Sequence, residues 1–184
     1  MTKRPAVFLD RDGTLVRDAH FLSDPAKVEL LAGVGTALRR FRGAGFELVV
    51  VTNQSGIARG LMTESDYEAV RRRLDVLLAE KEIQLTATYH CPHHPDVSGD
   101  CECRKPGTAL HRRAAEEHDL DLARSVFVGD RWRDVAPAIA LGGRRFLVPN
   151  ANTPDAEIAQ ARSEAQVLAS LGDVAALVAG EHAG

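Results

Sequence analysis

Short apolar runs alternate with longer segments of helical periodicity along this chain. The clearest runs cover residues 6–9, 46–51 and 125–128, and weaker ones cover 86–90, 145–148 and the pair 167–168. The three clear runs are rich in Val, Leu and Phe, a composition typical of strands that are buried on both faces. These runs therefore predict the strands of a parallel sheet.

Apolar residues between the runs recur at the spacing of a helix. Helices are expected at residues 34–41, 65–78, 108–118, 135–139 and 174–178. Ser65 and Glu68 have the spacing of a capping box, which predicts that the second helix begins there. Strands that alternate with helices predict an α/β fold, a doubly wound parallel sheet covered on both faces. Because neither a linker nor a repeat interrupts the pattern, residues 1–184 are expected to form a single domain.

Composition narrows the class of protein. Apolar residues make up 45% of the chain and charged residues 27%, which is typical of a globular domain. The formal net charge of -3 and the pI near 6.2 argue against a nucleic-acid partner, which usually requires a basic excess. No apolar run is long enough to cross a bilayer, and the first is too short for a signal-peptide core. We therefore expect a cytoplasmic monomer without a membrane partner.

Polar side chains follow three of the predicted strands directly. These residues are Asp10, Thr52 and Asp130. Ligand sites of open parallel sheets form at the carboxyl ends of the strands, so the three side chains are expected to lie together. Asp12 comes two residues after Asp10, and Gly13 permits the turn that would bring both carboxylates into one site.

The chemistry that these residues favour is phosphoryl transfer. Asp10 could attack phosphorus, while Asp12 could protonate the leaving oxygen and then deprotonate the attacking water. A Mg²⁺ ion would offset the repulsion between the carboxylates and a phosphate, with Asp130 as a further oxygen donor. Each short motif alone is a common turn or loop sequence, but their joint placement after apolar runs favours the catalytic interpretation.

Four motifs together resemble those of the haloacid dehalogenase superfamily of phosphatases. They are Asp10-Arg11-Asp12-Gly13-Thr14-Leu15, Thr52-Asn53-Gln54-Ser55-Gly56, Arg104-Lys105-Pro106 and Gly129-Asp130-Arg131-x-x-Asp134. They occur in the order of the family, and the resemblance extends from Phe8 to about Val148. It implies a doubly wound sheet with Asp10 at the end of the central strand. It also implies an open site, because the gaps between the motifs are too short for a large cap domain.

The resemblance implies a role for each matching residue. Asp10 would be the nucleophile and a magnesium ligand. Asp12 would be the general acid/base, and its backbone carbonyl would be a second magnesium ligand. Thr52 would donate its hydroxyl to a phosphoryl oxygen, and Lys105 would neutralise the nucleophile and the transferring group. Asp130 would complete the magnesium site.

Further residues are expected around this centre. By the same resemblance, Asp134 would lie beside the magnesium site. The substrate contacts expected are Asp18, Ala19, His20, Phe21, Asn53, Gln54, Ser55, Arg104 and Arg131.

The three cysteines lie in one short stretch together with histidines. An odd number in a reducing compartment argues against a disulfide framework. Cys91, His93, Cys101 and Cys103 supply four ligands of the kind that tetrahedral Zn²⁺ requires, with no open position, so a structural zinc-binding loop is predicted. Three free thiols in a surface loop are the alternative, but this loop lacks an apolar core and needs something else to order it. The zinc is expected to aim the nearby Lys105 into the site.

The zinc loop is similar to that of two families within the superfamily, the D-glycero-D-manno-heptose 1,7-bisphosphate phosphatases and the histidinol-phosphate phosphatases. The strings TNQSGIARG at residues 52–60 and YHCPHHP at 89–95 resemble the former more closely. Arg59, Arg104 and Arg131 suit a second phosphate of a small phosphorylated sugar.

Two alternatives remain open. Asp96, Asp100 and Glu102 could meet the ammonium group of histidinol phosphate. In a different class, the chain could be a non-catalytic zinc-stabilised binding module, although all the residues that catalysis needs are present.

Overall fold

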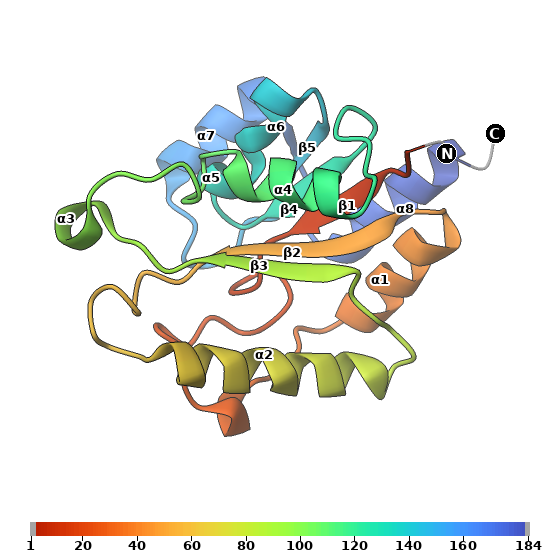
Figure 1. The fold of residues 1–184 in the computed structure, drawn as a ribbon. Helices are drawn as coiled ribbons and strands as arrows, with labels where there is room; N and C mark the ends of the chain where they lie inside the picture. The colour runs from red at the N-terminus through yellow and green to blue at the C-terminus, as the bar shows by residue number, and fades with distance from the viewer. Residues whose placement is uncertain (1–2, 183–184) are drawn as a thin grey trace.

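A parallel sheet of six strands forms the centre of the computed structural model, which describes residues 3–182 (Figure 1). Its order is β3-β2-β1-β4-β5-β6, and each neighbouring pair is parallel. The strands are β1 Ala6–Leu9, β2 Glu47–Asn53, β3 Ala87–Cys91, β4 Val126–Gly129, β5 Arg144–Leu147 and β6 Gln166–Val167. Every apolar run therefore contributes a strand, and the prediction of a doubly wound α/β fold with β1 at its centre is confirmed.

Helices cover both faces of the sheet. They are η1 Pro25–Lys27, α1 Val34–Gly43, α2 Glu64–Ala79, α3 Pro95–Ser98, α4 Ala109–Glu117, α5 Trp132–Val135, α6 Pro137–Leu141, α7 Asp155–Glu164 and α8 Leu171–His182. Two clusters of buried apolar side chains separate the layers. One lies between the sheet and α1, α2 and α8, and the other lies between the sheet and α4 and α6.

Successive residues of β1 contribute to opposite clusters. Val7 and Leu9 pack in the first cluster, whereas Ala6 and Phe8 pack in the second. Side chains of a strand alternate between faces, so burial on both sides requires the unbroken apolar run seen in the sequence. Each fully buried Val, Leu or Phe contributes about 1.5–3 kcal/mol, which fixes the strand and hence the position of the residue after it.

The predicted N-cap of α2, Ser65, was wrong by two residues. Thr63 is the N-cap, and its hydroxyl accepts from the Asp66 N–H at 3.1 Å while the Asp66 carboxylate accepts from the Thr63 N–H at 2.8 Å. Glu68 instead pairs with Arg71 at 2.8 Å. Thr63 and Asp66 have the same capping-box spacing as Ser65 and Glu68. Thr63 is the N-cap because its backbone is extended, with φ -96 and ψ 165.

Helix α7 was not anticipated. Ala161 is its one buried residue in the part of the chain that the structure describes, so the segment lacks the apolar stripe by which a helix is found in a sequence. Helix α7 carries Glu157, which forms a salt bridge with Arg131, one of the predicted substrate residues.

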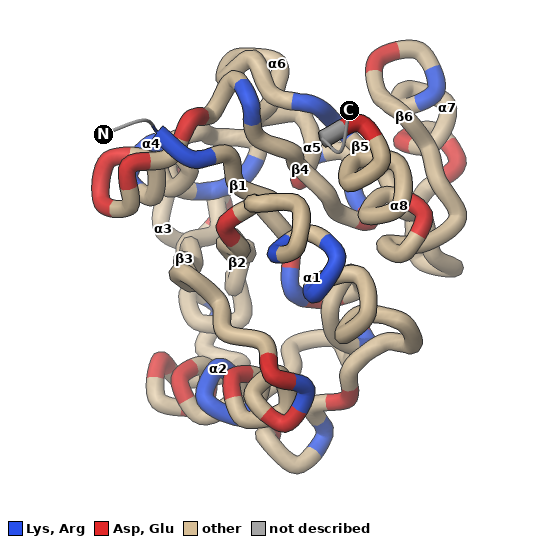
Figure 2. The backbone as a smooth tube through the Cα atoms, turned by 90° about the vertical axis from the view of Figure 1, so that its right-hand side faces the viewer, with Lys and Arg blue, Asp and Glu red and all other residues tan. Residues whose placement is uncertain are grey.

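The loops at the carboxyl ends of the strands, including the one that carries α3, extend to one side of the sheet in Figure 1. Within residues 3–182 no separate large cap domain covers these ends. Segments of both charge signs alternate along α2 in Figure 2. Among the described residues, no helix has the length and apolar character needed to span a membrane.

Candidate active site

Three buried carboxylates gather where β1 and β4 end. Asp10 follows β1, Asp130 follows β4, and Asp134 lies on α5, with ligand oxygens within 4.8 Å of one another. Asp134 reaches the group because α5 begins just after β4. A Cβ on Gly129 would lie 2.2 Å from the Asp134 Cβ, so this close approach requires glycine. The expectation that strand ends bring Asp10 and Asp130 together is thus met in the geometry.

The cluster favours a cation. Burial, then the charges of Asp134 and Asp10, raise the pKa of Asp130 to about 7. Burial also raises the pKa of Asp134, against the opposing charge of Lys105. Buried like charges are costly unless compensated, and oxygen donors are the ligands that Mg²⁺ prefers. The residues present therefore fit a magnesium ion.

Lys105 brings a positive charge into this cluster. Its Nζ lies 2.7 Å from Asp10 Oδ1, 2.8 Å from Asp134 Oδ1 and 2.6 Å from the carbonyl oxygen of Val51. Although burial lowers the pKa of Lys105, the charges of Asp10 and Asp134 outweigh it and raise that pKa. The ammonium group is therefore held charged against the residue expected to be the nucleophile.

The Asp12 carboxylate points to a different set of partners. Arg11 Nη2 and Gln54 Nε2 both donate to Asp12 Oδ2 at 2.8 Å. Gln54 Nε2 also donates to Thr52 Oγ1 at 3.0 Å, which leaves the hydroxyl proton of Thr52 free to donate elsewhere. Burial raises the pKa of Asp12 despite the Arg11 charge, a direction that suits a group that must carry a proton.

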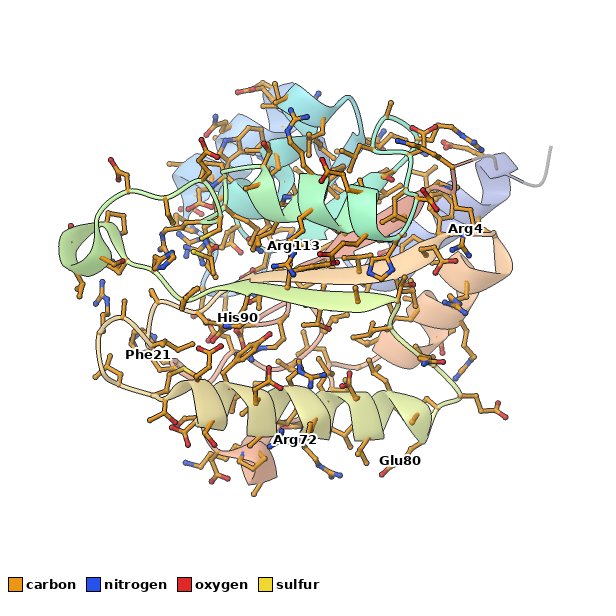
Figure 3. The ribbon with its side chains drawn as sticks, viewed as in Figure 1. Arg4, Phe21, Arg72, Glu80, His90 and Arg113 are labelled. Atoms are coloured by element: carbon orange, nitrogen blue, oxygen red, sulfur yellow. The ribbon has the colours of Figure 1, made fainter. Side chains whose placement is uncertain are left out.

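A cavity of about 260 Å³ opens over these groups. Its lining includes Asp10, Asp12, Thr52 and Asp130, together with the predicted substrate residues Asp18, His20, Phe21, Asn53, Gln54, Ser55 and Arg131. Figure 3 shows Phe21 at this end of the molecule. Two predicted substrate residues are not part of the lining. Ala19 is exposed outside it, and Arg104 Nη1 donates to the His93 carbonyl at 3.2 Å.

Four residues at or near the cavity were missed in the sequence, among them Leu22, which lines the cavity next to the predicted Phe21. Asn150 Nδ2 donates to Asp130 Oδ2 at 2.9 Å and to the Gly13 carbonyl at 3.3 Å, and Arg133 and Asn152 line the cavity. Asn150 comes three residues after the end of β5, so the same rule that selected Asp10 could have selected it. Arg133 is adjacent in sequence to a residue that the motif includes, but its orientation into the cavity has no sequence signal.

The predicted zinc ligands also lie together. Cys103 Sγ is 2.8 Å from Cys91 Sγ, 3.4 Å from Cys101 Sγ and 3.2 Å from His93 Nδ1. Burial, and then a hydrogen bond with Cys103, raise the pKa of the Cys91 thiol, so a metal is needed to stabilise the thiolate there. Three thiols and one imidazole form a donor set that fits tetrahedral Zn²⁺.

The two other histidines of this segment have different partners. His90 Nε2 lies 2.5 Å from Glu64, and the His90 ring packs on Tyr67 with centroids 3.9 Å apart. Figure 3 shows His90 between β3 and α2. His94 contacts Arg59 at 2.6 Å and accepts from the Asp96 N–H at 3.2 Å, which caps α3.

Activity is expected to require Mg²⁺, and Ca²⁺ is expected to support a rate at least about tenfold lower. Calcium prefers longer bonds and more ligands, which would displace Asp10, the carboxylate that is expected to attack phosphorus. The measurement is kcat at saturating concentrations of each ion. Equal rates with the two ions would count against a carboxylate shared between metal and phosphorus.

The purified protein is expected to hold about one zinc per chain, and Cys103→Ser is expected to lower both zinc content and kcat. Lys105 follows Cys103 by two residues, and a displacement of about 1 Å in a positioning group can cost on the order of 100-fold in rate. Elemental analysis, far-UV circular dichroism and kcat are measured together. A zinc-depleted, folded variant with full kcat would show that zinc only staples a surface loop.

Comparisons with known proteins agree on one kind of relative. The family model described as HAD-hydrolase-like matches residues 102–174. The chain is 41% identical over 161 residues to the D-glycero-beta-D-manno-heptose-1,7-bisphosphate 7-phosphatase of Escherichia coli K12, covering 83% of this chain and 84% of that protein. The enzyme of the same name from Photorhabdus laumondii is 35% identical and covers 96% of both chains.

A solved structure shows the same similarity in three dimensions. The D,D-heptose 1,7-bisphosphate phosphatase from B. bronchiseptica, complexed with magnesium and phosphate, has a TM-score of 0.84 to this chain and 33% sequence identity. The alignment covers 96% of this chain and 99% of that one.

Proposed function

The chain belongs to the haloacid dehalogenase-like hydrolases, in the family of the heptose 1,7-bisphosphate 7-phosphatases, and we propose that it removes the 7-phosphate of D-glycero-D-manno-heptose 1,7-bisphosphate. The observation that carries the proposal is the contact of Lys105 Nζ with Asp10 Oδ1 at 2.7 Å, at the end of the central strand and against the cavity. A carboxylate held beside a buried cation can attack a phosphate dianion that would otherwise repel it.

The reaction proceeds in two steps through an aspartyl phosphate. In the first, a carboxylate oxygen of Asp10 bonds to phosphorus, the bond from phosphorus to the sugar oxygen breaks, and Asp12 gives that oxygen its proton. In the second, the ionised Asp12 takes a proton from a water that attacks the same phosphorus, which releases phosphate and restores Asp10. The contacts of Asp12 with Arg11 and Gln54 must loosen for its carboxylate to reach the substrate.

The remaining groups stabilise charge. Lys105 and the Thr52 hydroxyl are positioned to bind phosphoryl oxygens as negative charge develops on them. A magnesium ion, held by Asp10, Asp130 and the Asp12 backbone carbonyl with Asp134 beside them, would supply Lewis-acid stabilisation of the same charge. Asn150 would orient Asp130 for this role.

Charges around the cavity support a bisphosphate over histidinol phosphate. Arg131 and Arg133 line the cavity and could meet a second phosphate. Arg131 is oriented by Glu157, at 2.5 Å. The three acidic residues considered for an ammonium group, Asp96, Asp100 and Glu102, are exposed and lie outside the cavity lining.

We further propose that the protein works in the cytoplasm, where its three free cysteines would hold zinc as thiolates.

The substrate assignment predicts a higher kcat/KM for heptose 1,7-bisphosphate than for histidinol phosphate. The expected ratio is at least about 100-fold, since histidinol phosphate has no second phosphate for Arg131 and Arg133 to bind. Steady-state assays of phosphate release, with both anomers of the bisphosphate, test it. A higher kcat/KM for histidinol phosphate than for either anomer would overturn the assignment.

A further inference from the structure

The side-chain amide of Asn53 binds the main chain of Lys105 in both directions. Asn53 Oδ1 accepts from the Lys105 N–H at 3.0 Å, and Asn53 Nδ2 donates to the Lys105 carbonyl at 3.1 Å. The two residues are 52 positions apart in the chain. The paired bonds give one residue of a loop the hydrogen bonding that a neighbouring strand would give it.

Lys105 needs such an anchor because neither a helix nor a strand holds it. It lies between α3 and α4, in a segment without regular secondary structure. Its ammonium group must nevertheless meet three acceptors, on Asp10, Asp134 and Val51, at 2.6–2.8 Å. A lysine stem is long and flexible, so the ammonium group is well placed only if the backbone beneath it is fixed.

Asn53 is itself held by the sheet and lies next to the zinc cluster. It is the last residue of β2 and pairs in register with Cys91 of β3. The next residue, Gln54, donates its N–H to the Cys91 carbonyl at 2.7 Å. The end of β2 therefore connects the metal cluster, the loop of Lys105 and the cavity.

We propose, resting on the proposed function, that Asn53 is a positioning residue that acts through Lys105. Its amide fixes the Lys105 backbone so that Nζ is presented to Asp10 and to the transferring phosphoryl group. A zinc ion bound by Cys103, two residues earlier, would hold the same loop, which would then have two anchors. Asn53 thus governs the rate of phosphoryl transfer and has little influence on sugar binding.

The test is a double-mutant cycle on kcat and KM, made of Asn53→Ala, Lys105→Met and the double variant. Asn53→Ala alone is expected to lower kcat on the order of 100-fold, with KM within about threefold of wild type and zinc content unchanged. In the Lys105→Met background, the same substitution is expected to change kcat by less than about threefold, because the group through which it acts is gone. Gln160→Ala, which removes an exposed amide on α7, is the matched control.

Direct recognition of substrate by Asn53 would give the opposite pattern. KM would then rise after Asn53→Ala in both backgrounds and the effects on kcat/KM would multiply, which would overturn the proposal. Asn53→Asp carries the test if Asn53→Ala does not fold. It is isosteric, but it replaces the donor facing the Lys105 carbonyl by an acceptor, so it is expected to lose kcat as Asn53→Ala does. A near-native kcat in Asn53→Asp would also refute the proposal.

The cycle separates this proposal from the choice of substrate. It is run on the heptose bisphosphate and on p-nitrophenyl phosphate, which has no sugar. Wild-type turnover of p-nitrophenyl phosphate alone would contradict the substrate assignment, while the coupling between Asn53 and Lys105 measured on that compound would still decide the role of Asn53. Absence of turnover on both compounds would overturn both proposals.

Discussion

Asp10→Asn is expected to abolish turnover, with a fall in kcat of about 10⁴-fold or more. An amide is a poor nucleophile toward phosphorus, and it removes the charge that Lys105 Nζ meets at 2.7 Å. It also removes one of three clustered carboxylates, so magnesium affinity is expected to fall as well. The measurement is phosphate release at saturating Mg²⁺ and substrate.

A matched control separates loss of the nucleophile from loss of structure. Asp75→Asn makes the same chemical change on α2, where Asp75 pairs with Arg71 at 2.8 Å, and is expected to keep near-native kcat. Far-UV circular dichroism of both variants should match wild type, because Asp10 follows β1 and the strand is held by its own apolar side chains. A folded Asp10→Asn protein with near-native phosphatase activity would show that the proposed mechanism is wrong.

Asp12→Asn is expected to lower kcat by about 10²–10⁴-fold while magnesium binding stays close to that of wild type. The Asp12 side chain faces Arg11 and Gln54 and lies outside the clustered carboxylates, so the amide changes proton transfer more than the metal site. The oxygen of the new amide can still accept from Arg11, which should preserve the local fold.

Both halves of the expected result for Asp12→Asn are measurable. Titration with Mg²⁺ reports on the metal site, and kcat reports on proton transfer. Near-native kcat would remove Asp12 from the role of general acid/base. If Asp12→Asn instead loses much of its magnesium affinity and regains its rate at high Mg²⁺, the Asp12 side chain contributes to metal binding rather than to proton transfer.

The strands and the residues that follow them could be predicted from the sequence, because a strand that is buried on both faces is an unbroken run of apolar residues. The apolar runs located the strands. The polar residues directly after three of these runs, Asp10, Thr52 and Asp130, were therefore assigned to the site, and all three line the cavity. The exact end of β2 was not predicted, since Thr52 and Asn53 continue the strand although they are polar. Residues at strand ends can thus be in the sheet and in the site at once.

Contacts between segments that are distant in the sequence could not be predicted in this way. Helix α7 lacks an apolar stripe, yet its Glu157 orients Arg131. The two hydrogen bonds between the Asn53 side chain and the Lys105 backbone depend on how a loop without secondary structure lies against β2. No local sequence pattern predicts that arrangement. Local rules could assign Asn53 to the cavity but could not distinguish a residue that contacts substrate from one that holds another residue.

Chemical trapping of the phosphorylated residue tests the central claim most directly. The protein is mixed with the heptose bisphosphate and Mg²⁺, quenched within the first turnovers and reduced with borohydride, which converts an aspartyl phosphate to homoserine. Peptide mass spectrometry is expected to find homoserine at position 10, and only when substrate is present. Substrate turnover without homoserine at position 10, or with it at another aspartate, would contradict Asp10 as the nucleophile.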